Sequence, residues 1–395
     1  MLATSAPRWR GDHASPFIFE MARHFLAEGV AVVLVVPRGP RDDGSPTPTR
    51  ETWEGVEIRR FRYFLRRGEV VAYASGIPNN LRTRPVRTLA LAPFFLAGFA
   101  RAARAAARDC DLVHANWLLT AALARTCCRG LPIVVTVHEN NIAAMLRRRL
   151  LGRLFSRALD RVDAAVAPSP QQASALLDHG VPAGRVHVIP CGIRLPARVV
   201  EHRAGSARIL WVGRVAPEKD VPTLLAAFRI VAQAEPQAHL TLVGDGPDLH
   251  RVRQGVAELG LEARVAIEGW RPPEDVAGYY ARADVVAVSS LSEAGPIVVM
   301  EGMAHGLPVV STPVGIVPTV VRHGHNGLLV PRRDAAAAAE AILSLVRDAE
   351  LRRRLGAEAR RTAEGLTWSH SARQYAELFR SVLRARRATP APEAP

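Results

Sequence analysis

The chain has 395 residues, of which 48% are hydrophobic and 23% charged. This composition is ordinary for a globular protein of two or three domains and excludes an intrinsically disordered chain. The formal net charge is +15, and every Lys or Arg position except Lys219 is an arginine, so this single lysine is a candidate for a special role.

The N-terminal half alternates short β-branched runs with alanine-rich helical stretches, the pattern of a parallel sheet covered by helices. Residues 1–5 are too short for the first strand that the following loop and helix (17–28) need. The longest apolar run, 88–100, is shorter than the roughly 20 residues that cross a bilayer, and no signal peptide is indicated. The predicted strands of this half are 31–36, 56–61, 112–115, 133–137, 164–167 and 186–189.

The C-terminal half repeats the same βα rhythm. Residues 195–206 lack periodicity and form the predicted linker, 367–387 reads as an amphipathic helix that packs back toward the first domain, and 388–395 as a disordered tail. We therefore expect an α/β protein with two Rossmann-like domains, 1–195 and 206–366, that face each other across a cleft. The predicted strands of this half are 208–212, 239–243, 265–268, 285–289, 308–311 and 327–330.

The sharpest chemical signal is Glu293 and Glu301, eight residues apart, where a predicted strand passes through a loop into a helix. Both side chains can point into a crevice at the carboxyl edge of a sheet. The amides of Gly295, Ile297 and Val298, around Pro296, lie where the loop becomes a helix, which is a natural anion site. A solvated helix start is the alternative for the two glutamates alone.

A second signal, V-G-R-V-A-P-E-K-D, closes the first strand of the same half. Gly213 allows a close backbone approach, and Arg214 and Lys219 can converge on a diphosphate. Two cations there stabilise a leaving nucleoside diphosphate more in the transition state than in the ground state. The alternative is surface ion pairing with Glu218 and Asp220.

Two weaker signals follow later strands of this half. The glycines Gly244 and Gly246 of L-V-G-D-G-P-D lie at the rim of the same crevice, although such residues make any tight βα turn. Gly269 and Trp270 of G-W-R-P follow the next strand and could stack on or hydrogen-bond a nucleobase.

In the first half, D-L-V-H-A-N-W and T-V-H-E-N-N each end a predicted strand with a polar cluster. His114 and His138 would then face the cleft, and His138 is the better placed to hydrogen-bond a sugar hydroxyl. A structural role is equally open for both histidines.

These motifs together resemble glycosyltransferase family 4, retaining enzymes with the GT-B fold. The resemblance is strong over 208–331 and looser over 11–192. It is carried by E-x7-E at Glu293 and Glu301, G-R-x4-K at 213–219, G-D-G-P, the H-x-N-W and T-V-H-E clusters, and V-I-P-C-G-I.

The resemblance implies roles for these residues. Glu301 would bind the nucleotide ribose, Glu293 and the amides of 295–298 the donor sugar, and Arg214 with Lys219 the diphosphate, while His138 would meet the donor sugar near its 6-hydroxyl. The catalytic residues implied are Glu293, Arg214, Lys219 and His138; those implied for donor binding are Glu301, Gly213, Gly295, Pro296, Ile297, Val298, Gly244, Gly246, Gly269 and Trp270.

The acceptor side departs from the family pattern. The usual first-loop Gly-Gly pair is G-D-H-A here, and E-G-F becomes E-A-G at 293–295. The acceptor-side residues expected are Gly11, Asp12, His13, His114 and Asn116.

The four cysteines show neither C-x-x-C spacing nor a nearby histidine pair, which argues against a zinc site or a disulfide framework. The resemblance implies that no cofactor and no essential metal are needed. The expected activity is transfer of a sugar from a UDP- or GDP-sugar to a hydroxyl of a glycan or lipid-linked acceptor, in cell-envelope or exopolysaccharide synthesis. Residues 145–159 read as a basic amphipathic helix of the kind that rests on anionic lipid or binds a polyanionic acceptor, and a solvated helix face in an arginine-rich protein is an equal alternative. With neither a spanning segment nor a signal peptide indicated, the expected location is the cytoplasm, with peripheral association at the inner membrane face if the helix binds lipid. Nucleic acid is not expected as a partner.

The alternative functions are an inactive nucleotide-sugar-binding protein and a nucleotide-sugar epimerase of the same fold.

Overall fold

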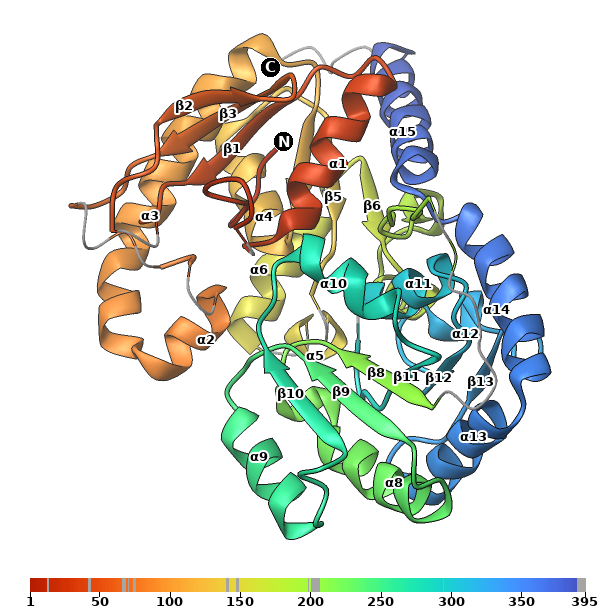
Figure 1. Ribbon diagram of the computed structural model, residues 1–395. Helices are drawn as coiled ribbons and strands as arrows, with labels where there is room; N and C mark the ends of the chain where they lie inside the picture. Colours follow the sequence, from red (N-terminus) through yellow and green to blue (C-terminus); the bar gives the residue numbers. More distant parts are fainter. Residues whose placement is uncertain are drawn as a thin grey trace. The chain divides into compact units, whose positions relative to one another are not determined.

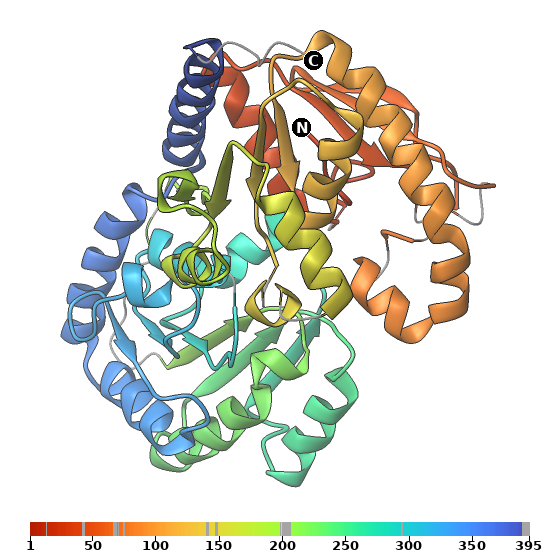
Figure 2. The same ribbon diagram turned by 180° about the vertical axis from the view of Figure 1, so that it is seen from behind.

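The computed structural model describes residues 1–12, 14–41, 44–65, 69, 71–73, 76–139, 142–146, 149–197, 199, 207–293 and 295–388. The chain forms two compact units (Figures 1 and 2). Unit 1 contains residues 1–189 and 368–395, and unit 2 contains 190–367.

The sheet of unit 1 has two parts that the first residues join. One part has the order β1-β3-β2, in which β2 is antiparallel, and the other is the parallel sheet β4-β5-β6-β7. Leu2 bridges both β1 and β4, so the short start of the chain fills the place of a strand between them. The strands are β1 (Val33–Pro37), β2 (Arg50–Trp53), β3 (Val56–Phe61), β4 (Val113–Asn116), β5 (Ile133–Thr136), β6 (Ala164–Ala167) and β7 (Val186–Val188).

Helices cover both faces of this sheet, and their buried residues follow the spacing of an amphipathic helix. Buried side chains of α3, α4 and α6 pack in one core cluster with Val113 and Ala115 of β4 (Figure 2). On the other face α15 packs on α1, where Phe25 contacts the ring of Tyr375 at 5.5 Å. The helices are α1 (Pro16–Ala27), α2 (Gly76–Thr83), α3 (Pro85–Ala106), α4 (Leu118–Cys127), α5 (Ile142–Leu146), α6 (Arg149–Leu159), α7 (Pro170–Asp178) and α15 (Trp368–Ala388), with 3-10 turns η2 (Ala107–Asp109) and η3 (Ala183–Arg185).

Unit 2 is a six-stranded parallel sheet in the order β10-β9-β8-β11-β12-β13. Its first three strands are added in one direction and its last three in the other, so the order reverses between β8 and β11. The strands are β8 (Arg208–Val212), β9 (His239–Val243), β10 (Val265–Gly269), β11 (Val285–Val288), β12 (Val309–Ser311) and β13 (Gly327–Leu329).

Two apolar clusters sandwich the sheet of unit 2. One joins it to α8, α9 and α13, and the other to α10, α11, α12 and α14. The helices are η4 (Pro217–Lys219), α8 (Val221–Ala234), α9 (Leu249–Glu258), α10 (Pro273–Tyr280), α11 (Ile297–Ala304), α12 (Val317–Val320), α13 (Ala335–Arg347) and α14 (Ala349–Glu364).

The chain changes units earlier than the predicted linker. Ile193 is buried in a core cluster of unit 2, and its amide donates to the Leu366 carbonyl at 2.9 Å. Unit 2 therefore begins at Pro190, while residues 201–206 of the predicted linker and 389–395 of the predicted tail lie outside the described residues.

By length and composition alone, one helical region, Pro85–Asp109, could cross a membrane. In its apolar 18-residue stretch, 33% of the residues are buried inside the protein. The buried residues of α3 include Leu91, Phe95, Phe99 and Ala106, which recur at helical spacing along one face. We therefore interpret α3 as a helix that packs on the sheet of unit 1 along this stripe.

Candidate donor site at the carboxyl edge of unit 2

The loops that follow β8 and β11 meet where the strand order of unit 2 reverses. Ligands of such open α/β sheets bind at this point, beside the carboxyl ends of the strands. The amide of Leu291 donates to the Glu218 carbonyl at 2.8 Å, and Ser289 Oγ donates to the Lys219 carbonyl at 2.9 Å. These two bonds fix the loops to each other.

Lys219 and Glu293 form an ion pair across this junction. The Lys219 ammonium donates to Glu293 Oε1, and Ser290 Oγ donates to the same oxygen at 2.8 Å. The side chains are 17% and 7% exposed. The predicted lysine and the first predicted glutamate therefore lie together in a partly dehydrated site, where an ion pair is stronger than at the surface.

Arg214 differs from Lys219. Its guanidinium pairs with Glu218 one turn along, and its side chain is 55% exposed. Arg214 therefore forms the surface ion pair with Glu218 that the sequence analysis gave as the alternative. Lys219 instead pairs with Glu293 in the less exposed junction of the two loops.

Glu301 lies in the second turn of α11, the helix that begins just after Glu293. The Tyr280 hydroxyl donates to Glu301 Oε2 at 2.9 Å. The Tyr280 ring stacks on His305, with centroids 4.9 Å apart and planes 19° apart. Burial raises the pKa of Glu301 above its usual range, and the Tyr280 hydrogen bond opposes that rise. Tyr280 is a functional candidate that sequence reasoning missed, because only the fold brings α10 to α11.

The start of α11 has the geometry expected for an anion. Pro296 is its N-cap residue with an extended backbone. The amides of Ile297 and Val298 fall in the first turn, where an α-helix offers donors without partners inside the helix. Gly295 precedes this turn, and the neighbouring Ala294 lies outside the described residues.

The glycines of G-D-G-P are required by close packing of the loops. A Cβ on Gly244 would lie 1.8 Å from the Gly213 carbonyl oxygen, and one on Gly246 would lie 2.2 Å from the Val215 oxygen. The Gly244 amide also donates to the Gly269 carbonyl at 2.7 Å. These glycines therefore shape the rim of the site by bringing the loops after β8, β9 and β10 together.

Trp270 follows Gly269 at the end of β10, and its side chain is 46% exposed. Gly269 has a φ of +70° with open space beside it. The flat indole of Trp270 has the shape and chemistry to stack on a base.

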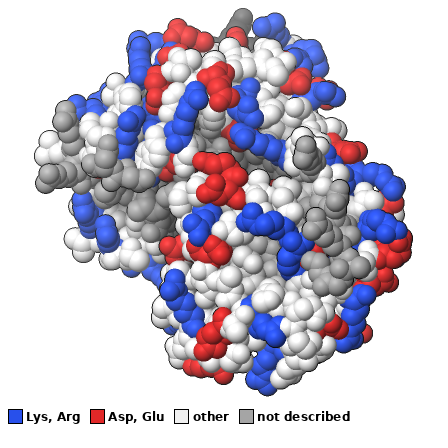
Figure 3. Space-filling view, in the orientation of Figure 1, with Lys and Arg blue, Asp and Glu red and all other residues white. Residues whose placement is uncertain are grey.

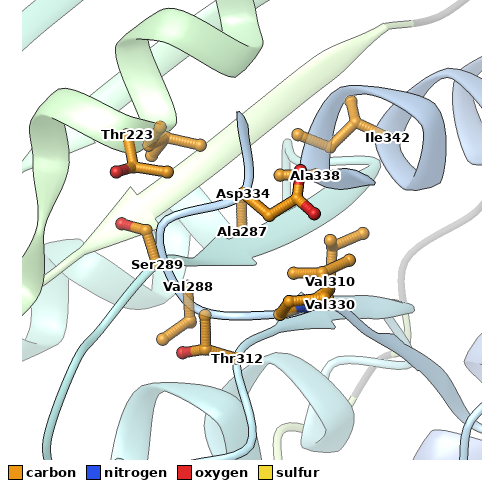
Figure 4. Close-up of a pocket in the computed structure, with 12 residues that line it drawn as sticks. Thr223, Ala287, Val288, Ser289, Val310, Thr312, Val330, Asp334, Ala338 and Ile342 are labelled. Carbon is orange, nitrogen blue, oxygen red and sulfur yellow. The ribbon is translucent and has the colours of Figure 1, made fainter. Parts of the chain in front are cut away.

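A separate small pocket lies on the α8 and α13 side of the sheet (Figure 4). Ser289, Thr312 and Asp334 contribute polar atoms, and the other lining residues are mostly apolar. None of the predicted donor-site residues lines it, so it is not the predicted donor site.

In unit 1, His138 lies in an aromatic and amide environment. The ring centroids of Phe17 and Trp117 lie 4.9 and 5.2 Å from that of His138, and His138 Nε2 is 3.0 Å from Asn116 Oδ1. Because Asn116 Nδ2 donates to the Leu2 carbonyl, its oxygen faces His138 and the Nε2–H donates. Burial lowers the pKa of His138 to about 3, so the ring is neutral and its Nδ1 is a hydrogen-bond acceptor.

Glu139, the residue after His138, was missed by sequence reasoning. Its Oε1 accepts from the Leu118 amide at 2.7 Å, at the first residue of α4, and Oε2 is a buried atom without a partner among the described residues. Burial raises the pKa of Glu139 to about 7. The residue before α4, Trp117, has a φ of +70° and a ψ of 151°, a strained conformation of the kind that clusters at functional sites.

The structure corrects the expectation for His114. It lies within β4, is 3% exposed, and is surrounded by Phe25, Tyr375 and Phe379. Its Nε2 is 2.8 Å from Thr136 Oγ1, and burial lowers its pKa well below the usual value. His114 is therefore a core residue of unit 1 and not an acceptor-side group.

The predicted first-loop residues are likewise structural where they are described. Asp12 is 3% exposed and forms a bidentate pair with Arg8, at 2.7 Å to Nε and 3.1 Å to Nη2. Gly11 supplies the positive φ of this turn. Asn116 is fully buried and acts by orienting His138, and His13 lies outside the described residues.

Among the described residues, no group of three or more His, Cys, Asp or Glu side chains could hold a metal ion.

Two family models divide the chain between them. Residues 14–195 match the model described as Glycosyltransferase Family 4, and residues 197–362 match Glycosyl transferases group 1. The D-inositol 3-phosphate glycosyltransferase of Frankia alni is 31% identical over 305 residues, which cover 69% of this chain and 74% of the relative. The chain belongs to glycosyltransferase family 4.

Other members and solved structures agree. The D-inositol 3-phosphate glycosyltransferase of Thermobispora bispora is 30% identical over 307 residues, 69% of this chain and 71% of the relative. Sucrose-phosphate synthase from Thermosynechococcus elongatus has a TM-score of 0.76 at 25% identity and 93% coverage of both chains. Anabaena Alr3699/HepE in complex with UDP and glucose has a TM-score of 0.70 at 19% identity, with 96% of this chain and 98% of that one covered.

These similarities confirm the predicted family, the GT-B fold class with its two parallel-sheet units, and the assignment as a glycosyltransferase.

Proposed function

We propose that this family 4 member is a retaining glycosyltransferase that moves a hexosyl group from a UDP- or GDP-sugar to a hydroxyl of a glycan or lipid-linked acceptor. The observation that carries the proposal is the ion pair between Lys219 and Glu293 where the strand order of unit 2 reverses. The pair places a cation that can bind the leaving diphosphate beside a carboxylate that can bind sugar hydroxyls.

In the proposed reaction the bond from the sugar C1 to the diphosphate oxygen breaks, and a bond from C1 to the acceptor oxygen forms on the same face. The acceptor proton leaves with the nucleoside diphosphate or with solvent. Lys219 and the first-turn amides of α11 stabilise the charge that develops on the diphosphate, which is where preorganised donors act most strongly. When Lys219 turns to the phosphate, the Glu293 carboxylate accepts hydrogen bonds from the sugar.

Glu301 is proposed to hold the two ribose hydroxyls of the nucleotide. Its Oε2 already accepts from Tyr280, so the carboxylate is oriented before the donor binds. Arg214 adds a second, more exposed cation at the diphosphate. His138 of unit 1 presents Nδ1 as an acceptor for a sugar hydroxyl, consistent with its neutral state.

The donor and acceptor classes rest on chemistry and on relatives. The solved structure of Anabaena Alr3699/HepE is a complex with UDP and glucose, which supports a nucleoside diphosphate sugar here. Relatives are named for D-inositol 3-phosphate and for exopolysaccharide phosphotransfer, which supports hydroxyl acceptors and a role in cell-envelope or exopolysaccharide synthesis. We propose that the enzyme needs no metal cofactor and no nucleic acid, and that it works in the cytoplasm, with peripheral association with the anionic inner face of the membrane.

The test is incubation of the purified protein with a panel of UDP- and GDP-sugars, followed by detection of free UDP or GDP and analysis of the sugar by mass spectrometry. Slow donor hydrolysis with one nucleotide, which accelerates with an acceptor, supports the transferase. Binding without release supports an inactive nucleotide-sugar-binding protein, and an isomeric sugar still bound to the nucleotide supports an epimerase. Either result overturns the proposal.

A further inference from the structure

Helix α3 carries two apolar stripes, and only one of them is covered. The buried stripe packs on the sheet of unit 1. On the solvent side Val86, Leu89, Pro93, Phe94 and Ala97 recur at helical spacing and are all exposed. A helix that is apolar all round is normally buried on all sides.

The exposed stripe belongs to a larger apolar surface. Val86, Leu89 and Phe94 are 81%, 60% and 55% exposed, and Leu65, which follows β3, is 74% exposed. The ring of Phe64 contacts that of Phe94, with centroids 5.9 Å apart. Of the thirteen large apolar side chains that are exposed among the described residues, seven lie between Phe64 and Leu96, so they are concentrated and not scattered.

The charged residues of α2, α3 and the residue between them are all arginines. Arg82, Arg84 and Arg87 are exposed at the end of α2 and the start of α3, and residues 82–108 contain six arginines and no acid. Figures 1 and 2 show α2 and the first turns of α3 extending away from the sheet of unit 1, and Figure 3 shows white surface bordered by blue side chains there. Two copies that met on this face would bring like charges together, whereas anionic headgroups complement them.

The basic helix α6, predicted from the sequence to contact membrane, has no free apolar face among its described side chains, which are those of residues 152–159. Its apolar side chains Phe155 and Leu159 are buried in the core of unit 1, and α6 packs on α4. Leu154, at 49% exposed, is its one large apolar side chain at the surface among those described. Residues 147 and 148 lie outside the described residues. The described part of α6 can therefore add positive charge but little apolar area.

We propose that the α3 patch, formed by Phe64, Leu65, Leu81, Val86, Leu89 and Phe94 with the arginines 82, 84 and 87, docks unit 1 on an anionic bilayer. Its apolar side chains enter the boundary between headgroups and acyl chains while α3 lies parallel to the membrane plane. The inference rests on the membrane association in the proposed function and locates it, but it does not depend on sugar transfer.

The experiment is co-sedimentation of the full chain with phosphatidylcholine vesicles, with and without phosphatidylglycerol. We expect pelleting that requires phosphatidylglycerol. The triple variant Val86→Ser, Leu89→Ser, Phe94→Ser should weaken it at least about tenfold. The double variant Arg82→Gln, Arg84→Gln should weaken it roughly 30-fold, since each arginine near the surface contributes about a fivefold factor.

Two control variants carry the same types of substitution at other exposed positions. Leu177→Ser, Val188→Ser, Ile230→Ser removes exposed apolar side chains elsewhere, and Arg353→Gln, Arg354→Gln removes exposed charges on α14. Both controls should pellet like the wild type, and all variants should keep its circular dichroism and unfolding midpoint.

Three results would overturn the proposal. They are wild-type protein that stays in the supernatant, a triple variant that pellets like the wild type, and a wild-type dimer that the triple variant converts to a monomer without loss of vesicle binding. The last would assign the face to a second copy of the chain. Because no sugar donor is present, these results are independent of any failure to detect transfer.

Discussion

Lys219 and Glu293 are 74 residues apart in the chain, and the Lys219 ammonium donates directly to the Glu293 carboxylate. The pair exists because β8 and β11 are neighbours in the sheet although two strands and three α-helices separate them in sequence. The two opposite charges meet in a site where the side chains are only 17% and 7% exposed.

Lys219→Ala should reduce kcat for donor turnover by up to about three orders of magnitude, because one phosphate contact near 4 Å at an effective dielectric of about 20 contributes about 4 kcal/mol. Lys219→Arg should recover only part of this, since a guanidinium has a different reach and shape. Donor hydrolysis measured at saturating nucleotide sugar tests it, with Arg253→Ala on α9 as the surface control. Unchanged kcat in Lys219→Ala would remove the lysine from the site.

Tyr280→Phe should raise KM for the donor about fivefold with a smaller effect on kcat, because Glu301 loses an orienting hydrogen bond of about 1 kcal/mol. The ring that stacks on His305 is kept. Tyr279→Phe is the control, since the adjacent hydroxyl donates to Glu268 at 2.7 Å and not to Glu301. Glu301→Ala should lose donor turnover by orders of magnitude. Equal KM values for the two tyrosine variants would contradict the role of Tyr280.

Glu139 should make the stability of the protein depend on pH. Its pKa is raised by burial from 4.5 to about 7 in the folded protein, so the folded state binds the proton more tightly than the unfolded state. Stability from this group is therefore present at low pH and decreases as pH rises from 4.5 to about 7, by at most about 3 kcal/mol. Thermal midpoints of wild type and Glu139→Gln should be similar near pH 4.5, and the variant should be the more stable at pH 8. A difference that does not change with pH would refute the assignment.

Gly244→Ala should be strongly destabilising and should displace the loop after β8, because its Cβ would lie 1.8 Å from a backbone oxygen at a φ of +141°. We expect a loss of more than about 3 kcal/mol. Gly255→Ala in α9 is the matched control: its Cβ would lie 3.5 Å from Leu225, and removing a helix glycine should stabilise by about 0.5–1 kcal/mol. Thermal unfolding of the two variants provides the comparison.

Much of the architecture could be predicted because buried parallel strands are short, continuous β-branched runs. All twelve predicted strands are present within a few residues of their expected bounds. The strand β2 was missed since R-E-T-W is polar, half-exposed and at an antiparallel edge. The role of Leu2 as a bridge between β1 and β4 depends on two strands more than thirty residues away.

The site was predictable where a motif lies in one segment and not where the fold joins segments. Residue type and spacing singled out Lys219 and Glu293, and the structure pairs them; their roles in the reaction stay a prediction. His114 was misplaced because the predicted strand gave no sign of which face its side chain lies on, and in β4 it faces Phe25 and Phe379 in the core. Tyr280 and Ser290 gave no signal of their own, because their partners lie on other elements or are fixed by a turn.

The last helix has a consequence for the order in which the chain folds. Tyr375 and Phe379 of α15 cover Phe25 and His114, and the Tyr375 hydroxyl is 2.9 Å from Thr136 Oγ1. During synthesis from the N-terminus these rings emerge only after residues 190–367 have been made. The ribosome therefore makes all of unit 2 before unit 1 can close its aromatic core, and that face of the first-made sheet stays uncovered until α15 has been synthesised.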